Sequence, residues 1–310
     1  MPDSPMRNAP NRIVTHWKLR SRVLELGRRT LVMGVVNVTP DSFSDGGLFL
    51  NAEEAVAHGL TMLDEGADLL DFGAESTRPG SQTIAAEEEQ ARLLPVLKGI
   101  LRERPEAVVS VDTYKAVTAR AAVAAGAEIV NDVSGFLWDS EMAAACAETG
   151  CGVVVMHTRG RPEEWGAQAQ LSSDELLETV RTGLKVSLDR AAEAGIAAES
   201  IVLDPGYGFG KRGEENFGLL ARQGELLGLG RPLLAGVSRK SFLGSVLSPL
   251  HGGKAAPVEA RETASLAGMV AAILHGASVV RVHSVRAAVE AALVADTVLL
   301  QMAEHRSGPM

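Results

Sequence analysis

Short runs of apolar residues recur along the chain and alternate with longer stretches of mixed polarity. The runs are mostly continuous rather than alternating in polarity, which is typical of strands buried on both faces of a parallel sheet. Eight strands are predicted in this way, at residues 31–36, 69–72, 107–111, 129–130, 153–156, 201–203, 233–237 and 279–282. The stretches between them, such as 52–64 and 260–275, have the length and apolar spacing of amphipathic helices.

A weak internal repeat supports this division of the chain. Residues 66–71, 126–131 and 276–281 each begin with Gly-Ala and continue through one polar, two apolar and one polar residue. Gly can adopt the left-handed conformation that ends a helix, so each copy predicts a helix stop followed by a strand. Eight strand–helix units in regular order predict an α/β fold, a single (β/α)₈ TIM barrel, with a doubly wound open sheet as the alternative.

The barrel accounts for nearly the whole chain. Residues 1–30 are predicted to be an N-terminal extension whose part 11–29 forms a short cap segment under the barrel. Residues 31–303 form the barrel, and residues 304–310 are expected to be a disordered tail. No second domain is expected, since one α/β barrel of about 250 residues with extensions accounts for the length.

Composition and charge exclude several functional classes. Hydrophobic residues make up 46% of the 310 residues, enough for a sizeable core, and the formal net charge of −9 argues against a nucleic-acid surface. The first dozen residues lack an apolar signal region, and no run approaches the roughly 18 apolar residues of a membrane span. Cys146 and Cys151 have no second cysteine pair with which to build a zinc site, so a reduced, cytoplasmic protein is predicted.

Polar residues follow every predicted strand. They are Asn37, Asp71 with Glu75, Asp112, Asn131 with Asp132, His157, Asp204, Ser238-Arg239-Lys240, and Arg281 with His283. Any one of them is explained as a turn residue or a cap of the next helix. Caps do not require Lys, Arg and His together, however, so the set predicts a polar pocket with both signs of charge at the carboxyl ends of the strands.

Three other motifs are rejected. Residues 208–213 fit G-x-G-x-x-G, but they lie in the sixth unit of eight and carry no further dinucleotide signal. Gly210-Lys211 lacks the earlier Gly and the following Ser or Thr of a phosphate-binding Walker loop. The serine-containing turns do not spell G-x-S-x-G, the motif of the serine hydrolases.

Five segments carry a specific resemblance to a known family. They are N-V-T-P-D-S-F-S-D-G-G at 37–47, E-S-T-R-P-G at 75–80, D-P-G-Y-G-F-G-K at 204–211, G-V-S-R-K-S at 236–241 and R-V-H at 281–283. Together they resemble the signatures of the dihydropteroate synthases, and the resemblance runs from about residue 31 to about residue 300. Enzymes of this family are transferases of an alkyl group other than methyl. They condense 6-hydroxymethyl-7,8-dihydropterin pyrophosphate with p-aminobenzoate in folate biosynthesis. They are also the target of sulfonamides.

The resemblance also implies a set of site residues. The pterin-binding positions are Asp112, Asn131, Met156, Asp204, Phe209, Lys240 and Arg281. Pyrophosphate would meet Asn37, Thr77, Arg281 and His283, and Asn37 would also meet a Mg²⁺ ion. The p-aminobenzoate positions are Phe43, Thr77, Arg78, Pro79, Gly208, Phe209, Lys240 and Ser241. Asp112, Asp41 and Lys240 are the catalytic candidates, and a homodimer is the expected assembly.

The expected chemistry is electrostatic. The aniline nitrogen of p-aminobenzoate is already nucleophilic, so an S_N1-like path through a cationic pterin methylene fits, with stabilisation of the cation as the main protein contribution. Two alternatives stay open: a methyltransferase that uses methyltetrahydrofolate and holds the same ring, and a paralogue that binds pterin without catalysis. The motif at 238–241 and the Arg281/His283 pair argue against the first, and the intact set of polar residues argues against the second.

Overall fold

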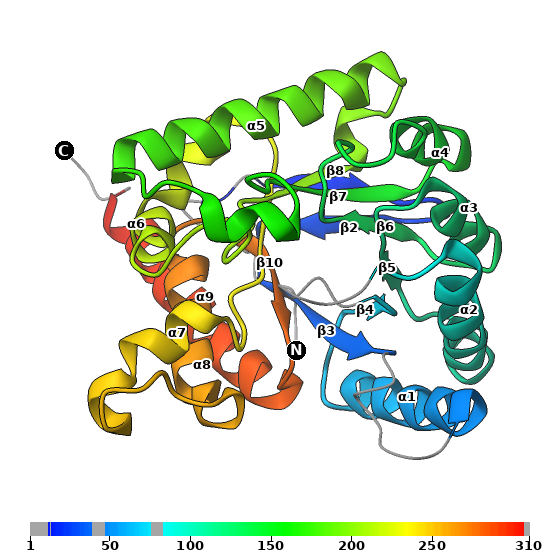
Figure 1. Ribbon diagram of the computed structural model, residues 1–310, viewed down its shortest axis with the longest axis horizontal. Helices are drawn as coiled ribbons and strands as arrows, with labels where there is room; N and C mark the ends of the chain where they lie inside the picture. The colour runs from blue at the N-terminus through cyan, green and yellow to red at the C-terminus, as the bar shows by residue number, and fades with distance from the viewer. Residues whose placement is uncertain (1–11, 13, 39–46, 76–82, 307–310) are drawn as a thin grey trace.

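The computed structural model describes residues 12, 14–38, 47–75 and 83–306 and shows a β-hairpin followed by a barrel (Figure 1). The hairpin strands are β1 (Thr15–Lys18) and β2 (Val23–Leu26). The barrel strands are β3 (Leu31–Asn37), β4 (Leu69–Gly73), β5 (Val109–Asp112), β6 (Ile129–Asp132), β7 (Gly152–Met156), β8 (Ile201–Asp204), β9 (Leu233–Ala235) and β10 (Ala277–Val282). All eight predicted barrel strands are confirmed.

The eight strands form one closed parallel sheet. Their order round the barrel is their order in the chain, and β10 pairs with both β9 and β3, which closes the ring. The (β/α)₈ prediction is therefore confirmed and the open sheet is excluded. Because all the strands run the same way, their carboxyl ends meet at one rim, which is where barrel enzymes carry their chemistry.

Helices surround the barrel and return the chain between strands. In the described part of the chain the α-helices are α1 (Gly47–Asp64), α2 (Ala86–Glu103), α3 (Ala116–Ala124), α4 (Met142–Thr149), α5 (Ser173–Glu193), α6 (Glu215–Arg222), α7 (Ser241–Val246), α8 (Glu262–Leu274) and α9 (Val285–Arg306). None of these helices is long and apolar enough to cross a bilayer. Gly66, Gly126 and Gly276 have φ angles of +103°, +115° and +99°, as the repeat predicts for helix stops.

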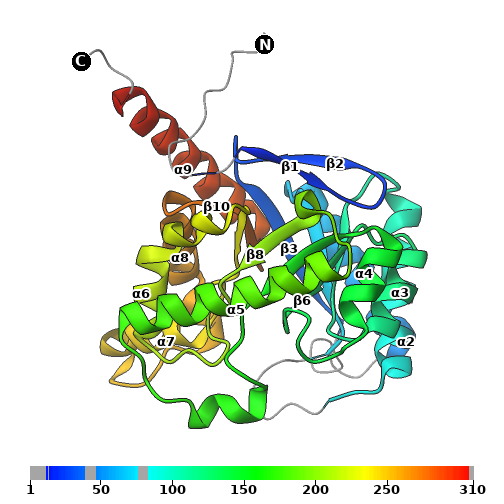
Figure 2. The same cartoon turned by 90° about the horizontal axis from the view of Figure 1, so that it is seen from above.

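The hairpin closes the end of the barrel opposite the rim. Trp17, Leu19 and Leu26 are buried in one cluster with the apolar side chains that fill this end of the barrel, among them Met33 and Val279. Figure 2 shows the hairpin at one end, while the 3₁₀ helix η2 (Pro162–Ala167), which follows β7, lies at the other. The predicted cap segment is thus a two-stranded antiparallel sheet, an element that the sequence pattern does not indicate.

The C-terminal helix α9 extends into the predicted tail. The sequence predicts a tail from residue 304, but α9 continues through Arg306, so residues 304–306 are helical and the predicted boundary is wrong there. Residues 307–310 lie outside the described residues. The preceding turns of α9 bury Val285, Ala288, Ala292, Ala295 and Leu299 against the barrel, which gives the helix a packing reason to continue.

Candidate active site

Strand register brings the predicted polar residues to one rim. Asn37 lies opposite Gly73, Gly73 lies opposite Asp112, and Asp112 lies opposite Asn131 across three successive strand pairs. On the far side of the barrel, Met156 lies opposite Asp204. Side chains of paired residues point to the same face of a sheet, so these residues project together from the inner wall.

The centre of the site is an ion-pair network round Arg281. The Arg281 guanidinium donates through Nε to Oδ2 of Asp71, at 2.6 Å, and through Nη2 to Oδ2 of Asp112, at 3.0 Å. Asp71 Oδ2 also accepts a hydrogen bond from Nδ2 of Asn131, at 3.0 Å. One cation on β10 therefore links carboxylates on β4 and β5, and the amide on β6 joins the same network.

Burial changes the acidity of Asp112. Desolvation, together with the charges of Asp71 and Glu89, raises the pKa of its carboxyl to about 7 against the opposing effects of Arg281 and Lys240. An aspartate with a pKa near 7 gains or loses its charge within the pH range in which most enzymes work. Such perturbed pKa values are common at functional sites.

Asp204 stabilises a turn with one carboxylate oxygen and faces the site with the other. Its Oδ1 accepts a hydrogen bond from the backbone N–H of Gly206, at 2.7 Å, so the alternative interpretation of this residue as a turn residue is partly right. Its Oδ2 lies 3.8 Å from the position that a Cβ on Gly236 would take, and the Cβ of Arg281 lies at the same distance. Burial raises the pKa of Asp204, and the neighbouring Lys240 opposes that rise.

An aromatic ring and an ammonium group stack at the edge of the site. The Nζ of Lys240 lies 4.0 Å from the centroid of the Phe209 ring, and Phe209 packs edge-on against Trp165 at 5.2 Å. Gly208 has a φ of +81°, and a Cβ there would approach Lys240 Cδ to 3.4 Å. The loop thus forms a flat apolar wall beside a cation, suited to an aromatic ring that carries a negative charge.

A tight turn after β9 presents the residues of the 238–241 motif. Arg239 adopts a left-handed backbone with φ of 60°, and its N–H donates to Ser265 Oγ at 2.9 Å. Ser238 Oγ lies 2.9 Å from Nδ1 of His283, which follows β10. Ser241 begins α7, with Lys240 in the capping position.

Lys211 is a buried residue to which the sequence assigned no role. It is 5% exposed, and its Nζ donates to the backbone carbonyls of Gly206 (2.7 Å), His157 (3.2 Å) and Phe209 (3.3 Å). Burial lowers its pKa to about 7. Lys211 ends the 204–211 motif, but nothing in its spacing indicates that the side chain folds inward to hold the loop.

Five predicted site residues belong to the two segments that follow β3 and β4 in the sequence. Asp41, Phe43, Thr77, Arg78 and Pro79 lie outside the described residues. Glu75, the last described residue before the second of these gaps, accepts a hydrogen bond from Tyr114 Oη at 2.5 Å and pairs with Lys115. The chain is therefore anchored at the point where the second motif begins.

No metal cluster is built into the part of the chain that the structure describes, counting groups of three or more His, Cys, Asp or Glu side chains. Asn37 ends β3 with an exposed side chain at the rim. Mg²⁺ commonly keeps several waters and binds through substrate phosphates with few protein ligands. An isolated amide oxygen therefore fits a metal that arrives with a phosphorylated substrate, and does not fit a permanently bound one.

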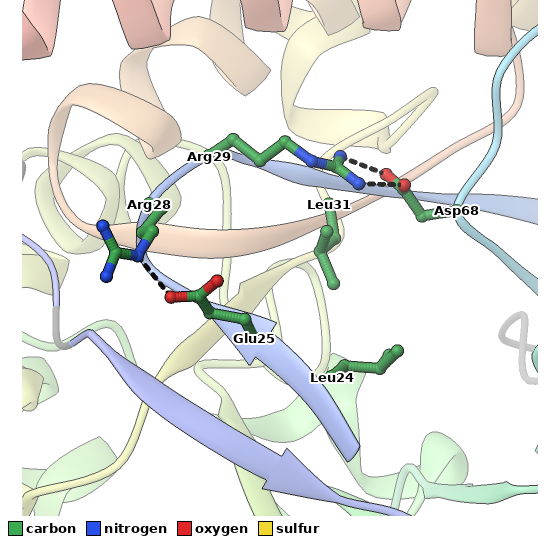
Figure 3. A pocket seen from close by; sticks show the side chains of 6 residues that line it. All are labelled: Leu24, Glu25, Arg28, Arg29, Leu31 and Asp68. Carbon is green, nitrogen blue, oxygen red and sulfur yellow. Dashed lines mark hydrogen bonds and ion pairs between the residues drawn. The ribbon is translucent and has the colours of Figure 1, made fainter. Parts of the chain in front are cut away.

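A separate pocket lies at the opposite end of the barrel, beside the hairpin. Figure 3 shows Arg29 facing Asp68 and Arg28 facing Glu25 across it, with Leu24 and Leu31 as its apolar part. Arg29 donates to both oxygens of Asp68, at 2.8 and 2.5 Å. The charged side chains of this pocket pair with one another, and the Arg29–Asp68 pair links the segment after the hairpin to the barrel. None of the predicted site residues lines this pocket.

Comparison with known proteins places the chain among pterin enzymes. Residues 33–283 match the family described as pterin binding enzyme. A dihydropteroate synthase of Mycobacterium leprae is 46% identical over 260 residues, which cover 84% of this chain and 90% of that protein. A dihydropteroate synthase of Escherichia coli K12 is 41% identical over 268 residues, covering 86% and 91%.

Solved structures agree with the sequence relatives. The dihydropteroate synthase of Xanthomonas albilineans, solved with 4-aminobenzoic acid, superposes with a TM-score of 0.82 at 39% identity and covers 96% of this chain and 100% of that one. The enzyme from Clostridium difficile, solved in the presence of pteroic acid, gives a TM-score of 0.80 at 39% identity and covers 89% and 98%.

Proposed function

The chain belongs to the dihydropteroate synthases, the pterin-binding transferases of folate biosynthesis, and from this premise we propose how its own residues carry out the reaction. The reaction forms a C–N bond between the pterin methylene and the amine of p-aminobenzoate, and breaks the C–O bond to pyrophosphate. The observation that carries the proposal is the ion-pair network of Arg281 with Asp71 and Asp112, which lies among the other pterin-binding candidates.

The pterin ring binds between Asp204 and Asn131. A carboxylate can accept parallel bonds from the amino group and a ring N–H of the pterin, and Asp204 is held for this by the N–H of Gly206. Asn131 donates its Nδ2 to Asp71, so its oxygen lies on the other side of the amide and can accept from the ring. Lys240 serves the ring acceptors, and Met156, opposite Asp204 in the sheet, contributes an apolar surface.

The leaving pyrophosphate meets Arg281, His283 and Asn37. Arg281 and His283 lie at the end of β10, directly before α9, whose N-terminal N–H groups also favour an anion. Ser238 Oγ lies 2.9 Å from Nδ1 of His283 and so orients the imidazole ring at this end of β10. Asn37 would hold a Mg²⁺ ion together with the substrate phosphates, and that ion would neutralise part of their charge.

Asp112 stabilises the positive charge that develops on the pterin methylene. Its carboxylate is buried beside Arg281, in surroundings where a negative charge acts strongly on a nearby cation. Arg281 and Lys240 favour the ionised form of Asp112, so its negative charge is kept beside the methylene. Asp41 remains a second candidate for this role.

The p-aminobenzoate ring lies along the wall formed by Phe209 and Lys240. The cation–π stack offers a flat surface and a positive charge. Ser241, at the start of α7, meets the carboxylate, while the side chain of Lys240 lies along the ring. The aniline nitrogen then attacks the cationic methylene and loses its proton after the bond has formed, so the site needs no strong base.

Pyrophosphate release by the purified protein tests the function. The protein is supplied with the pterin pyrophosphate and Mg²⁺, with and without p-aminobenzoate, and compared with Lys240→Ala and with the exposed control Lys254→Ala. We expect release that requires p-aminobenzoate, falls about 100-fold in Lys240→Ala and is unchanged in the control. Tight pterin binding without release would instead identify a catalytically silent pterin-binding protein, and methyl transfer from methyltetrahydrofolate would identify a methyltransferase.

We also propose that the chain forms a homodimer through helices near the end of the barrel. Leu293, Val294 and Val298 on α9 are 63%, 66% and 44% exposed, and contiguous apolar side chains of this kind support an interface. Light scattering coupled to gel filtration would give the mass of a dimer. A monomer at micromolar concentration would contradict this assignment and leave the activity unaffected.

The compartment that we propose is the cytoplasm. Cys146 and Cys151 are both free and buried, and they lie close in the chain. Free thiols so near each other are typical of proteins that work in a reducing compartment.

A further inference from the structure

Asp71 is a fully buried carboxylate in the ion-pair network of the site, and the reaction does not require it to touch a substrate. It lies in the middle of β4, and its side chain has no exposed surface, whereas the side chains of Arg281 and Asp112 above it are 19% and 18% exposed. Asp71 therefore lies beneath the rim residues, on the side of the barrel core.

One oxygen of Asp71 holds two predicted ligands of the pterin pyrophosphate. Its Oδ2 accepts from Arg281 Nε and from Asn131 Nδ2, which come from β10 and β6 on opposite sides of β4 and β5. The guanidinium is planar, so a bond at Nε fixes the direction in which its remaining N–H groups point. The amide is oriented in the same way, since donation by Nδ2 sets the direction of its oxygen.

The other oxygen of Asp71 has no hydrogen-bond partner within the described part of the chain. The same holds for the hydroxyl of Ser110, which is paired with Asp71 in the strand register. A buried carboxylate with one unpartnered oxygen is a costly way to fill a barrel core, where apolar residues of similar size pack more stably. The position of Asp71 is therefore better explained by the orientation of its two partners than by stability.

We propose that Asp71 is a positioning residue, which aims the guanidinium of Arg281 and the amide of Asn131 at the pterin pyrophosphate and shares the charge of Arg281 with Asp112. This inference rests on the proposed function. It adds to it a residue that acts through others rather than by contact with the substrate.

Sharing Arg281 has a consequence for Asp112 that a purely structural role would lack. Four charged groups act on Asp112: Arg281 and Lys240 favour its ionised form, while Asp71 and Glu89 oppose it. Neutralising Asp71 removes one opposing charge and leaves Arg281 to pair with Asp112 alone. The pKa of Asp112 then falls, so the acid limb of the pH profile moves to lower pH.

Asp71→Asn tests the inference because it keeps the shape of the side chain and removes its charge. The matched control is Asp296→Asn, in the ion pair of Asp296 with the buried Arg12 (2.9 Å) at the opposite end of the barrel. Both variants are assayed for thermal stability, for the KM of each substrate and for kcat/KM as a function of pH.

We expect Asp71→Asn to lower kcat/KM for the pterin pyrophosphate by about 100-fold, mainly through KM, and to move the acid limb to lower pH. The KM for p-aminobenzoate at saturating pterin stays near the wild-type value. Asp296→Asn loses stability and keeps both kinetic properties. Wild-type kinetics in Asp71→Asn, or a loss of stability alone as in the control, would overturn the inference.

A second variant covers the case in which Asp71→Asn does not fold. Asp71→Glu keeps the charge and moves it by about one bond length, so it should raise the KM for the pterin pyrophosphate while leaving the acid limb in place. A Glu variant with wild-type KM would equally refute the role. Failure of the proposed function is distinguishable from both results, because the wild-type protein itself would then release no pyrophosphate.

Discussion

Replacing Trp17 by Ala should destabilise the whole barrel without altering its substrate affinities. Trp17 is fully buried in the hairpin, in one cluster with side chains from nearly every barrel strand. Its Nε1 donates to the carbonyl of Ser200 at 2.9 Å, which ties the hairpin to the start of β8. A Cβ on Gly152 would come within 3.2 Å of the same nitrogen, so the indole fits closely against β7.

The magnitude follows from these contacts. Truncating a fully buried Trp to Ala costs about 3–5 kcal/mol in lost burial and cavity formation. The carbonyl of Ser200 also loses its donor, and an unsatisfied buried acceptor adds about 1–3 kcal/mol unless water reaches it. Trp17→Phe separates the two contributions, because it keeps most of the ring and loses only the hydrogen bond and a smaller volume. Its cost should therefore be about 1–3 kcal/mol.

Urea unfolding followed by circular dichroism measures these differences as changes in the free energy of unfolding. Val23→Ala is the control on the same hairpin: Val23 is 56% exposed, so its truncation should change stability by less than about 0.5 kcal/mol. The KM values of all three variants should equal those of the wild type, since the hairpin lies at the end of the barrel away from the rim. A loss below about 1 kcal/mol for Trp17→Ala would refute the view that the hairpin completes the core.

Three further predictions concern the site itself. The value of kcat/KM for the pterin pyrophosphate should fall as pH drops through about 7, because Asp112 acts in its ionised form and burial raises its pKa to about 7. If kcat/KM instead stayed unchanged down to the ordinary aspartate pKa of about 3.9, this prediction would be contradicted. Phe209→Leu removes the ring beneath the Lys240 ammonium and should raise the KM for p-aminobenzoate about tenfold in steady-state kinetics, and an unchanged KM would show that the ring is only packing. Gly206→Ala should abolish most activity and lower the melting temperature, because a Cβ there would lie 1.9 Å from a backbone carbonyl. Gly230→Ala is the control, since Gly230 has a similar φ of +73° but open space around it. This variant carries the backbone strain without the steric clash and should leave activity intact.

Some features of this protein follow from local sequence pattern. The eight barrel strands were predictable because strands buried on both faces give continuous apolar runs, and the helix stops because Gly66, Gly126 and Gly276 occupy backbone conformations that other residues avoid. The rim was predictable too, since parallel strands place the residues that follow them at one end. The positions of Asp112, Asn131, Asp204 and Arg281 at the ends of their strands therefore suffice to assign them to one site.

Other features depended on contacts that no local pattern encodes. Asp71 and Arg281 are separated by 210 residues, and only closure of the ring between β3 and β10 brings their side chains within 2.6 Å. Lys211 resembles an ordinary polar loop residue in the sequence, since lysines usually extend into water, yet it lies inside the loop because three carbonyls converge on it. The hairpin was missed for a related reason: its strands are only four residues each, and Trp17 is buried by the barrel rather than by its own neighbours. Local periodicity and backbone conformation therefore suffice to predict the elements and the rim at which their polar residues lie. The pairing of charges within that rim was decided by tertiary structure, because ion pairs depend on distances in space that chain separation does not set.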